Sequence, residues 1–392
     1  MKKLLIASAI AMVATGATAQ VKVGVILGFT GPLESITPGM AASAELALKE
    51  VSESGLLLGG QKIESVRADS TCTDAAAASA AAERLITSDG VSAIMGADCS
   101  GVTTAIANNV AVPKGVVMVS PSATSPALTT IEDKGFFFRT APSDARQGQV
   151  LADIVMGRGI KEIAVTYTNN DYGKGLSESF ANAFKAAGGK VAITASHEDG
   201  KADYSAEVGA LAASGAEHLA VFGYIDQGGK GIIQSSLDAG AFEQFVMADG
   251  MVGQALVDAM GDDLKGSFAT LPGNEGDGAK LFVEMAKAND IDPDGPYRGE
   301  SYDAAALIAL AMQAAKSTDR AAIQAKIMDV ANAPGEKILP GELAKGLKIL
   351  AEGGEIDYQG ATSVELTDVG ESGGSYKELE VKDNKFSTVK VH

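Results

Sequence analysis

Small polar side chains follow two apolar segments that the sequence predicts to be neighbouring strands. Ser100 and Thr103 come after the first segment, and Ser122 and Thr124 come after the second. Each strand end therefore offers hydroxyl and free backbone N–H groups at a helix N-terminus, where partial positive charge gathers. Two such corners at the carboxyl edge of a parallel sheet can hold a small anion without an arginine. We interpret them as a carboxylate-binding site.

A second set of polar residues follows predicted strands further along the chain. Tyr172, Tyr224 and Asp249 each come shortly after an apolar segment. Aromatic faces and a carboxylate suit an ammonium group, through cation–π attraction and a charge-assisted hydrogen bond. A purely local explanation is also open, because Ser and Thr are common N-caps and Asp-Gly is common in turns. Taken together, the two sets favour a site for a small zwitterion.

Residues for catalysis or for metal binding are not grouped in the sequence. The three histidines, His197, His218 and His392, have no Cys, Asp or second His at ligand spacing. No Gly-x-Ser-x-Gly elbow and no Walker loop is present, and the glycines of residues 24–31 have the wrong spacing for a dinucleotide loop. We therefore expect no catalytic residues, no metal and no cofactor.

The elements that must position these residues alternate between strand and helix, which indicates parallel sheets with helices on both faces. One block of alternation ends near residue 139 and a second, of similar length, ends near residue 271. Residues 275–332 are then mostly helical, and residues 302–315 are apolar around nearly the whole helix, as in a buried helix. The final residues return to short strands.

This order predicts an α/β fold of two Rossmann-like, doubly wound lobes. We expect one lobe from residues 20–140 plus 272–356 and the other from residues 141–271 plus 357–392. The chain would cross between them at residues 139–142, 270–272 and 355–358, and three crossings make a hinge rather than a loose linker.

The N-terminal segment has the features of a secretory signal. Lys2 and Lys3 precede an apolar stretch, and Ala17-Thr-Ala19 is a small-residue cleavage site, so we expect cleavage after Ala19. Without residues 1–19, which hold two lysines and no acidic residue, the formal net charge changes from −18 to −20. Such an acidic chain repels phosphate backbones, so nucleic acid is a poor candidate partner.

The two cysteines, Cys72 and Cys99, each come at the carboxyl end of a predicted strand, and we expect those strands to be neighbours. An exported protein can keep a disulfide. A reactive thiol is the alternative, but Cys99 has no basic neighbour in sequence to lower its pKa. We favour a structural disulfide, which by chain entropy is worth about 3–4 kcal/mol.

The chain resembles the periplasmic solute-binding proteins of branched-chain amino acid and amide ABC transporters, over nearly the whole length after residue 19. The motifs that carry the resemblance are Gly28-Phe-Thr-Gly-Pro32, Asp69-Ser-Thr-Cys72, Gly96-Ala-Asp-Cys-Ser100, Ser120-Pro-Ser-Ala-Thr-Ser-Pro126, Phe138-Arg-Thr140, Asp171-Tyr-Gly173 and Tyr302-Asp303. The resemblance implies a type I periplasmic binding fold with a three-stranded hinge, and a Cys72–Cys99 bridge.

Carried over by motif, the resemblance also implies the ligand contacts. Ser100, Ser122 and Thr124, with the intervening Ala123, would hold the α-carboxylate, whereas Tyr172, Tyr224 and Asp249 would meet the α-ammonium. The segment 33–38 is longer than the family pattern leads us to expect, and it would place Glu34 and Ser35 near the side-chain pocket.

These observations predict a non-catalytic, monomeric periplasmic receptor. It would close on a small, branched-chain-like amino acid and deliver it to an inner-membrane ABC permease. The wider family also takes amides, γ-amino acids and aromatic carboxylates, so these ligands stay open. Two further alternatives are a sensor that partners a receptor, and an enzyme on the same scaffold, although the missing phosphate loop argues against the enzyme.

Overall fold

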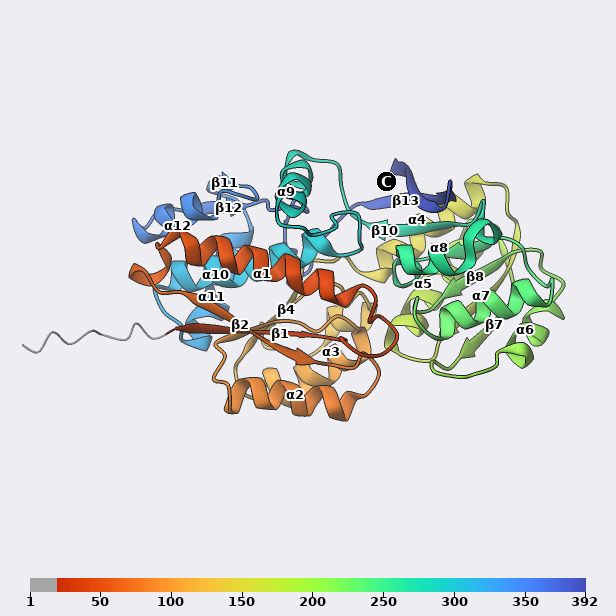
Figure 1. The fold of residues 1–392 in the computed structure, drawn as a ribbon, viewed down its shortest axis with the longest axis horizontal. Coiled ribbons are helices and arrows are strands. Elements are labelled where there is room, and N and C mark those ends of the chain that lie inside the picture. Colours follow the sequence, from red (N-terminus) through yellow and green to blue (C-terminus); the bar gives the residue numbers. More distant parts are fainter. Residues whose placement is uncertain (1–19) are drawn as a thin grey trace, which may run out of the picture.

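The computed structural model describes residues 20–392, so the predicted signal segment lies outside the described residues. Two lobes lie side by side, each built on one large sheet, as Figure 1 shows. None of the described helices is long and apolar enough to cross a membrane.

The first lobe contains a five-stranded parallel sheet in the order β2-β1-β3-β4-β5. Helices α2 and α3 cover one face of this sheet. Helix α1 covers the other face, together with α10 (Arg298–Ala315) and α11 (Arg320–Ala331) from later in the chain. The elements of this first part of the chain are β1 (Val21–Leu27), α1 (Thr37–Ser54), β2 (Ile63–Asp69), α2 (Ala75–Thr87), β3 (Ala93–Gly96), α3 (Ser100–Ile106), β4 (Val117–Ser120) and β5 (Phe137–Arg139).

The second lobe contains a seven-stranded sheet in the order β14-β13-β10-β9-β8-β6-β7, in which β13 is antiparallel to both of its neighbours. Helices α4 and α5 lie on one face and α6 and α7 on the other. The elements are α4 (Asp144–Gly157), β6 (Glu162–Thr168), α5 (Asp171–Ala186), β7 (Lys190–His197), α6 (Ser205–Ala212), β8 (Leu219–Phe222), α7 (Gly228–Asp238), β9 (Phe245–Met247), α8 (Gln254–Met260), β10 (Phe268–Pro272), β13 (Tyr376–Lys382) and β14 (Lys385–Val391).

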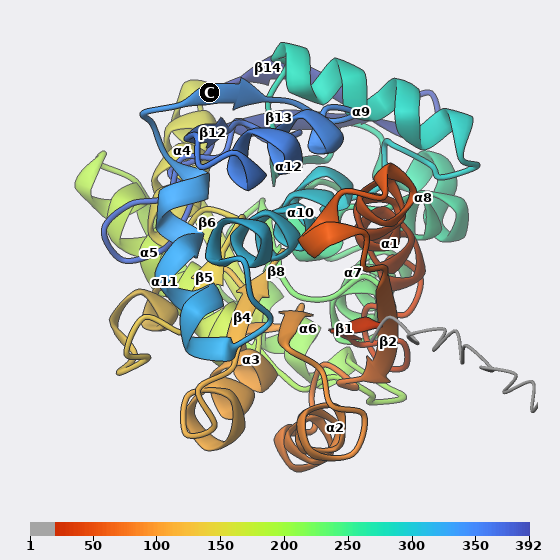
Figure 2. The same ribbon diagram turned by 90° about the vertical axis from the view of Figure 1, so that its left-hand side faces the viewer.

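The helical insert between β10 and β13 returns to the first lobe. Its elements are α9 (Asp277–Ala288), α10 (Arg298–Ala315), α11 (Arg320–Ala331), β11 (Glu336–Ile338), α12 (Leu343–Ala351) and β12 (Ile356–Tyr358). Helix α10 is buried along almost its whole length and packs between α1 and α11, which Figure 2 shows from the end of the first lobe. The expected α/β fold of two doubly wound lobes is confirmed, including the buried helix.

Local sequence explains where several helices begin. The Asp74 carboxylate accepts hydrogen bonds from the N–H groups of Ala76 and Ala77, at 2.9 and 3.0 Å, and so caps α2. The Asn170 side chain caps α5 in the same way through the N–H of Gly173, at 3.1 Å. Because α5 starts directly after β6, this cap fixes the position of the residues that begin the helix.

The three crossings between the lobes run next to one another. The Arg139 N–H donates to the Gly370 carbonyl at 3.0 Å, the Ser372 N–H donates to the Arg139 carbonyl at 3.1 Å, and β10 pairs with β13. The third crossing lies later than predicted, because residues 356–358 form β12 and pair with β11 in the first lobe.

The disulfide between Cys72 and Cys99 is present, with a Cα–Cα distance of 5.2 Å. The strands that precede the two cysteines are not neighbours as predicted, because β1 lies between β2 and β3. The bridge passes over the end of β1, at Gly28. A β-carbon at Gly28 would lie 3.1 Å from the Cys72 Cβ and 3.1 Å from the Asp98 Oδ2, so a residue without a side chain makes room for the crossing.

Candidate ligand-binding site

A small cavity between the lobes is bounded by residues at the carboxyl ends of strands from both sheets. Its volume is about 20 Å³, which is room for about one water molecule, so a larger ligand could enter only if the lobes moved apart. The residues that line it are Leu33, Ile36, Met40, Asp98, Cys99, Ser100, Ser122, Tyr172, Tyr224, Asp249, Gly250 and Tyr297.

Five of the seven predicted ligand-binding residues line this cavity, namely Ser100, Ser122, Tyr172, Tyr224 and Asp249. Ala123 and Thr124 are fully buried and do not line it. The predicted helix after Ser122 is instead a short 3₁₀ helix, Pro126–Thr130, so the second corner is a loop that ends in one helical turn.

The corner contributed by the first lobe is held by its own hydrogen bonds. The Ser122 hydroxyl donates to the Asp98 carbonyl at 3.1 Å, and the Ser125 N–H donates to the Ser100 hydroxyl at 3.1 Å. The buried guanidinium of Arg139 donates to the carbonyls of Ala123 and Ser125, at 3.1 and 2.9 Å. These contacts fix the loop, so its hydroxyls are oriented before any ligand binds.

Asp98 lines the same corner, but its carboxylate is satisfied by the first lobe. Its oxygens accept the Gly28 N–H at 3.0 and 3.1 Å, and the Ser70 hydroxyl donates to it at 3.0 Å. Burial raises the pKa of Asp98, and the Gly28 hydrogen bond acts against that effect. The residue therefore supports the corner and links it to the end of β1.

The opposite side of the cavity is acidic and phenolic. Asp249 is 3% exposed, and its two carboxylate oxygens accept the Tyr172 hydroxyl at 3.1 Å and the Tyr297 hydroxyl at 2.7 Å. The rings of Tyr172 and Tyr224 stack with centroids 5.3 Å apart. Burial raises the pKa of Asp249, and the bond from Tyr297 acts in the opposite direction. An ammonium group placed here would meet a carboxylate in a water-poor environment, where charge attraction is strong.

A second buried acid lies behind Asp249. Both carboxylate oxygens of Asp144 lack a hydrogen-bond partner among residues 20–392. The same is true of the Thr124 hydroxyl and of the side-chain carbonyl oxygen of Gln147. Burial raises the pKa of Asp144 well above its usual value, and the nearby charge of Asp249 adds to the increase. A ligand with positive charge would relieve the repulsion between these two buried acids, which the charge of Arg139 opposes only in part.

Several residues of the candidate site could hardly be recognised from sequence alone. Tyr297 precedes α10 in the helical insert, so only the packing of that insert against the second lobe brings its hydroxyl to Asp249. Asp144 looked like an ordinary first-turn acid of a helix. The apolar side chains Leu33, Ile36 and Met40 could have been suspected, because they come from the long segment after β1 and the start of α1.

The prediction for that segment was wrong in detail. Glu34 is exposed and lines no part of the cavity. Ser35 is also exposed, and its N–H donates to the Asp226 carboxylate at 2.8 Å, while the Asp226 N–H donates to the Pro32 carbonyl at 3.0 Å. The segment thus joins the two lobes at the cavity rim, and Leu33 and Ile36 face the cavity in place of the polar residues.

A metal site finds no support in the residues that the structure describes. The single group of possible ligands among them consists of Cys72, Asp98 and Cys99. Both cysteine sulfurs are joined in the disulfide, so neither is a free thiolate for a metal.

The chain is similar to known proteins over most of its length. A family model described as periplasmic binding protein matches residues 20–340. The Leu/Ile/Val-binding protein homolog 3 of Brucella melitensis is 32% identical over 325 residues, which are 80% of this chain and 84% of that protein. The leucine-, isoleucine-, valine-, threonine-, and alanine-binding protein of Pseudomonas aeruginosa is 29% identical over 302 residues, 76% and 79% of the two chains.

Among solved structures, the leucine-binding protein LivK of Thermotoga maritima superposes with a TM-score of 0.79 and 25% identity, and the match covers 95% of this chain and 98% of that one. The chain therefore belongs to the periplasmic binding protein family, with the type I fold. It is a solute-binding protein of the periplasm rather than an enzyme, and it resembles the members named for branched-chain amino acids.

Proposed function

We propose that the protein binds an aliphatic, branched-chain-like amino acid between its lobes and delivers it to an inner-membrane ABC permease. The observation that carries this proposal is the combination of three kinds of side chain in the cavity lining. Ser100 and Ser122 supply hydroxyl groups, Asp249 supplies a carboxylate, and Leu33, Ile36 and Met40 form an aliphatic part. An α-amino acid has a carboxylate, an ammonium group and a side chain to match them.

The aliphatic part favours a particular class of ligand. It consists of Leu33, Ile36 and Met40 and contains no charged group, so it suits a hydrocarbon side chain. A simple aromatic carboxylate would leave Asp249 without a cation in a buried site, which is costly. The names of the relatives from Brucella melitensis and Pseudomonas aeruginosa agree with the amino acid.

Delivery to a permease would require the lobes to alternate between open and closed forms around the three crossings. A ligand that contacts both lobes shifts that equilibrium toward the closed form. We infer that the protein acts as a monomer after cleavage of the signal segment behind Ala19.

The test of this function is calorimetric. Leucine, isoleucine and valine should bind, whereas γ-aminobutyrate, short amides and benzoate should bind weakly or not at all. Asp249→Ala should weaken leucine by about 1.5–3 kcal/mol, the contribution of a hydrogen bond to a charged group. Unchanged affinity in Asp249→Ala would remove the ammonium assignment, and tighter binding of benzoate than of leucine would reject the amino acid.

A further inference from the structure

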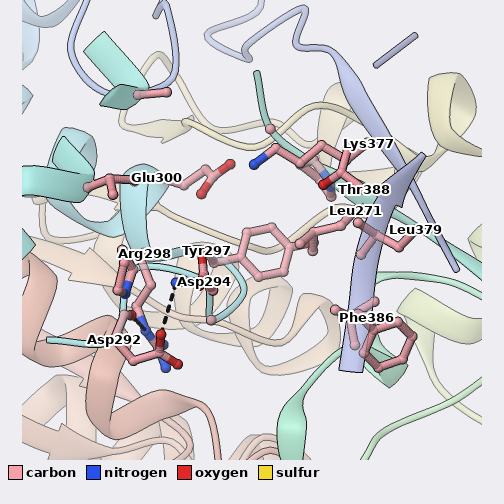
Figure 3. A pocket seen from close by; sticks show the side chains of 18 of the residues that line it. Leu271, Asp292, Asp294, Tyr297, Arg298, Glu300, Lys377, Leu379, Phe386 and Thr388 are labelled. Carbon is pink, nitrogen blue, oxygen red and sulfur yellow. Dashed lines mark hydrogen bonds between the residues drawn. The ribbon is translucent and has the colours of Figure 1, made fainter. Parts of the chain in front are cut away.

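A larger cavity, which we call the hinge groove, lies between the lobes beside the second and third crossings. Its volume is about 570 Å³, within the range of small-molecule sites. Helices α9 and α10 form the wall on the side of the first lobe, and β10, β13 and β14 form the wall on the side of the second (Figure 3). Part of the lining is apolar, namely Leu271, Phe282, Leu379 and Phe386.

Two opposite charges face one another across the hinge groove. Glu300 projects from α10 and is only 5% exposed. Its backbone carbonyl accepts the Thr140 hydroxyl at 2.9 Å, but its carboxylate accepts no hydrogen bond from another residue in the described part of the chain. Lys377 projects from β13, and Figure 3 shows its amino group directed toward the Glu300 carboxylate. They form no direct ion pair, although the charge of Lys377 still influences Glu300.

An isolated buried carboxylate is costly unless a cation reaches it. Burial raises the pKa of Glu300 to about 7, and the charge of Lys377 lowers it in part. Since the lysine does not reach the carboxylate, the space between them has a negative end and a positive end. A simple cation or a simple anion would satisfy one end alone.

We propose that the hinge groove is a second binding site, for a small zwitterion whose ammonium group meets Glu300 and whose carboxylate meets Lys377. Free amino acids have this chemistry, and the apolar lining can accept an aliphatic side chain. The site is separate from the cavity that contains Asp249, so the inference does not depend on the proposed function.

The two cavities share one side chain. Tyr297 lines both of them, and its hydroxyl donates to Asp249 at 2.7 Å. The hinge groove also takes its walls from both lobes, so a ligand in it would bind best to one relative position of the lobes. By linkage, occupancy of the hinge groove should then change affinity in the first cavity, and the reverse.

The test is a titration of the full protein, with labelled leucine and methionine methyl groups, followed by NMR. Leu271 and Leu379 report on the hinge groove, and Leu33 and Met40 report on the first cavity. Glycine, leucine and γ-aminobutyrate serve as probes with different charge separations. At least one should give saturable shifts at Leu271 and Leu379. Those shifts should need about tenfold more probe, or more, after Glu300→Gln or Lys377→Met, because each loses a charged contact.

Two further variants separate the sites. Lys382→Met, at the exposed end of β13 and outside the groove, should leave the groove shifts unchanged. Asp249→Ala should abolish the response of Leu33 and Met40, whereas the groove should still give saturable shifts, at a probe concentration that the linkage between the sites can alter. Groove shifts that vanish in Asp249→Ala and survive Glu300→Gln and Lys377→Met would report lobe closure alone and overturn the proposal. The absence of saturable groove shifts with all three probes would overturn it too, whatever Leu33 and Met40 show.

Discussion

At the residue scale, the hydrogen bond between Tyr297 and Asp249 joins the two lobes inside the candidate binding cavity. Tyr297 lies in the first lobe and Asp249 in the second, and their bond measures 2.7 Å. The neighbouring Arg298 guanidinium donates to the Ile36 carbonyl at 2.7 Å, which ties the Tyr297 turn to the start of α1. A β-carbon at Gly39 would lie 2.3 Å from that guanidinium, so glycine is needed for this contact.

Removing the Tyr297 hydroxyl should therefore weaken ligand binding through the closed form. We expect Tyr297→Phe to cost about 1.5–3 kcal/mol in amino acid affinity, since the lost bond is to a charged group. Most of the change should appear as faster ligand release, measured by stopped flow alongside calorimetry. Tyr204→Phe is the matched control, because that hydroxyl bonds to the Glu198 carbonyl within the second lobe. Equal losses in the two variants would refute a special role for Tyr297.

His197 gives the protein a pH dependence that can be assigned to one residue. Its Nδ1 pairs with the Thr166 hydroxyl at 2.9 Å, its Nε2 has no partner among residues 20–392, and burial lowers its pKa to about 4. An unfolded histidine titrates near 6.5. The folded state thus binds fewer protons between these values, and stability is fully present above about 6.5 and is lost as the pH falls toward 4.

Urea unfolding should detect this effect as a difference between wild type and His197→Asn. From about pH 7.5 to about pH 5, the wild type should lose about 2 kcal/mol more than the variant. The comparison is necessary because burial raises the pKa of Glu300 to about 7 and of Asp303 to about 6. Because the pKa values of these two acids are raised in the folded state, their contribution to folding stability is lost as the pH rises, which is the opposite direction. Parallel pH profiles for the two proteins would show that His197 is not responsible.

At the scale of elements, the disulfide joins two loops across the end of an intervening strand. Cys72 and Cys99 are 27 residues apart, so the bridge restricts a loop of moderate size in the unfolded chain. We expect the double variant Cys72→Ala with Cys99→Ala to lose about 3–4 kcal/mol of unfolding free energy. Urea titration of wild type with and without reductant gives the same comparison without a substitution. A reduced wild type as stable as the oxidised one would contradict the estimate.

The sequence predicted the alternation of elements well, because buried strands such as β1 and capped helices such as α2 depend on local pattern. It did not predict that β1 would lie between β2 and β3. Strand order in a parallel sheet depends on how the helices pack, and residues adjacent in sequence carry little information about it. The third crossing was placed too early for the same reason, since β12 pairs with β11.

The candidate binding residues differ in the same way. Ser100, Tyr172, Tyr224 and Asp249 follow strands, and topology alone brings the carboxyl ends of parallel strands together. Tyr297 comes from an inserted segment whose position depends on the packing of two lobes. No local pattern in the sequence reports such a contact.

At the scale of the whole molecule, the proposed function depends on how closely the two lobes can approach each other. The exposed rim contact of Asp226 with Ser35 is one place where they meet. Another is Gly175 on α5, which lies against Pro126 and Ser125 of the first lobe. A β-carbon at Gly175 would lie 2.7 Å from the Pro126 Cδ and 3.2 Å from the Ser125 hydroxyl oxygen. Closure to this distance therefore requires glycine at that position.

A larger residue at Gly175 should hold the lobes apart without unfolding either of them. Gly175→Leu replaces a helical glycine and should stabilise α5 by roughly 0.5–1 kcal/mol, yet it should weaken the amino acid at least about tenfold, because the closed form is blocked. Small-angle scattering should show no compaction on addition of ligand. Gly209→Leu is the control, since it makes the same change in helix α6, where a β-carbon meets nothing within 4 Å. If Gly175→Leu binds as tightly as Gly209→Leu, and compacts as much, the close approach seen at Pro126 is not what binding requires, and the closing motion must be sought elsewhere.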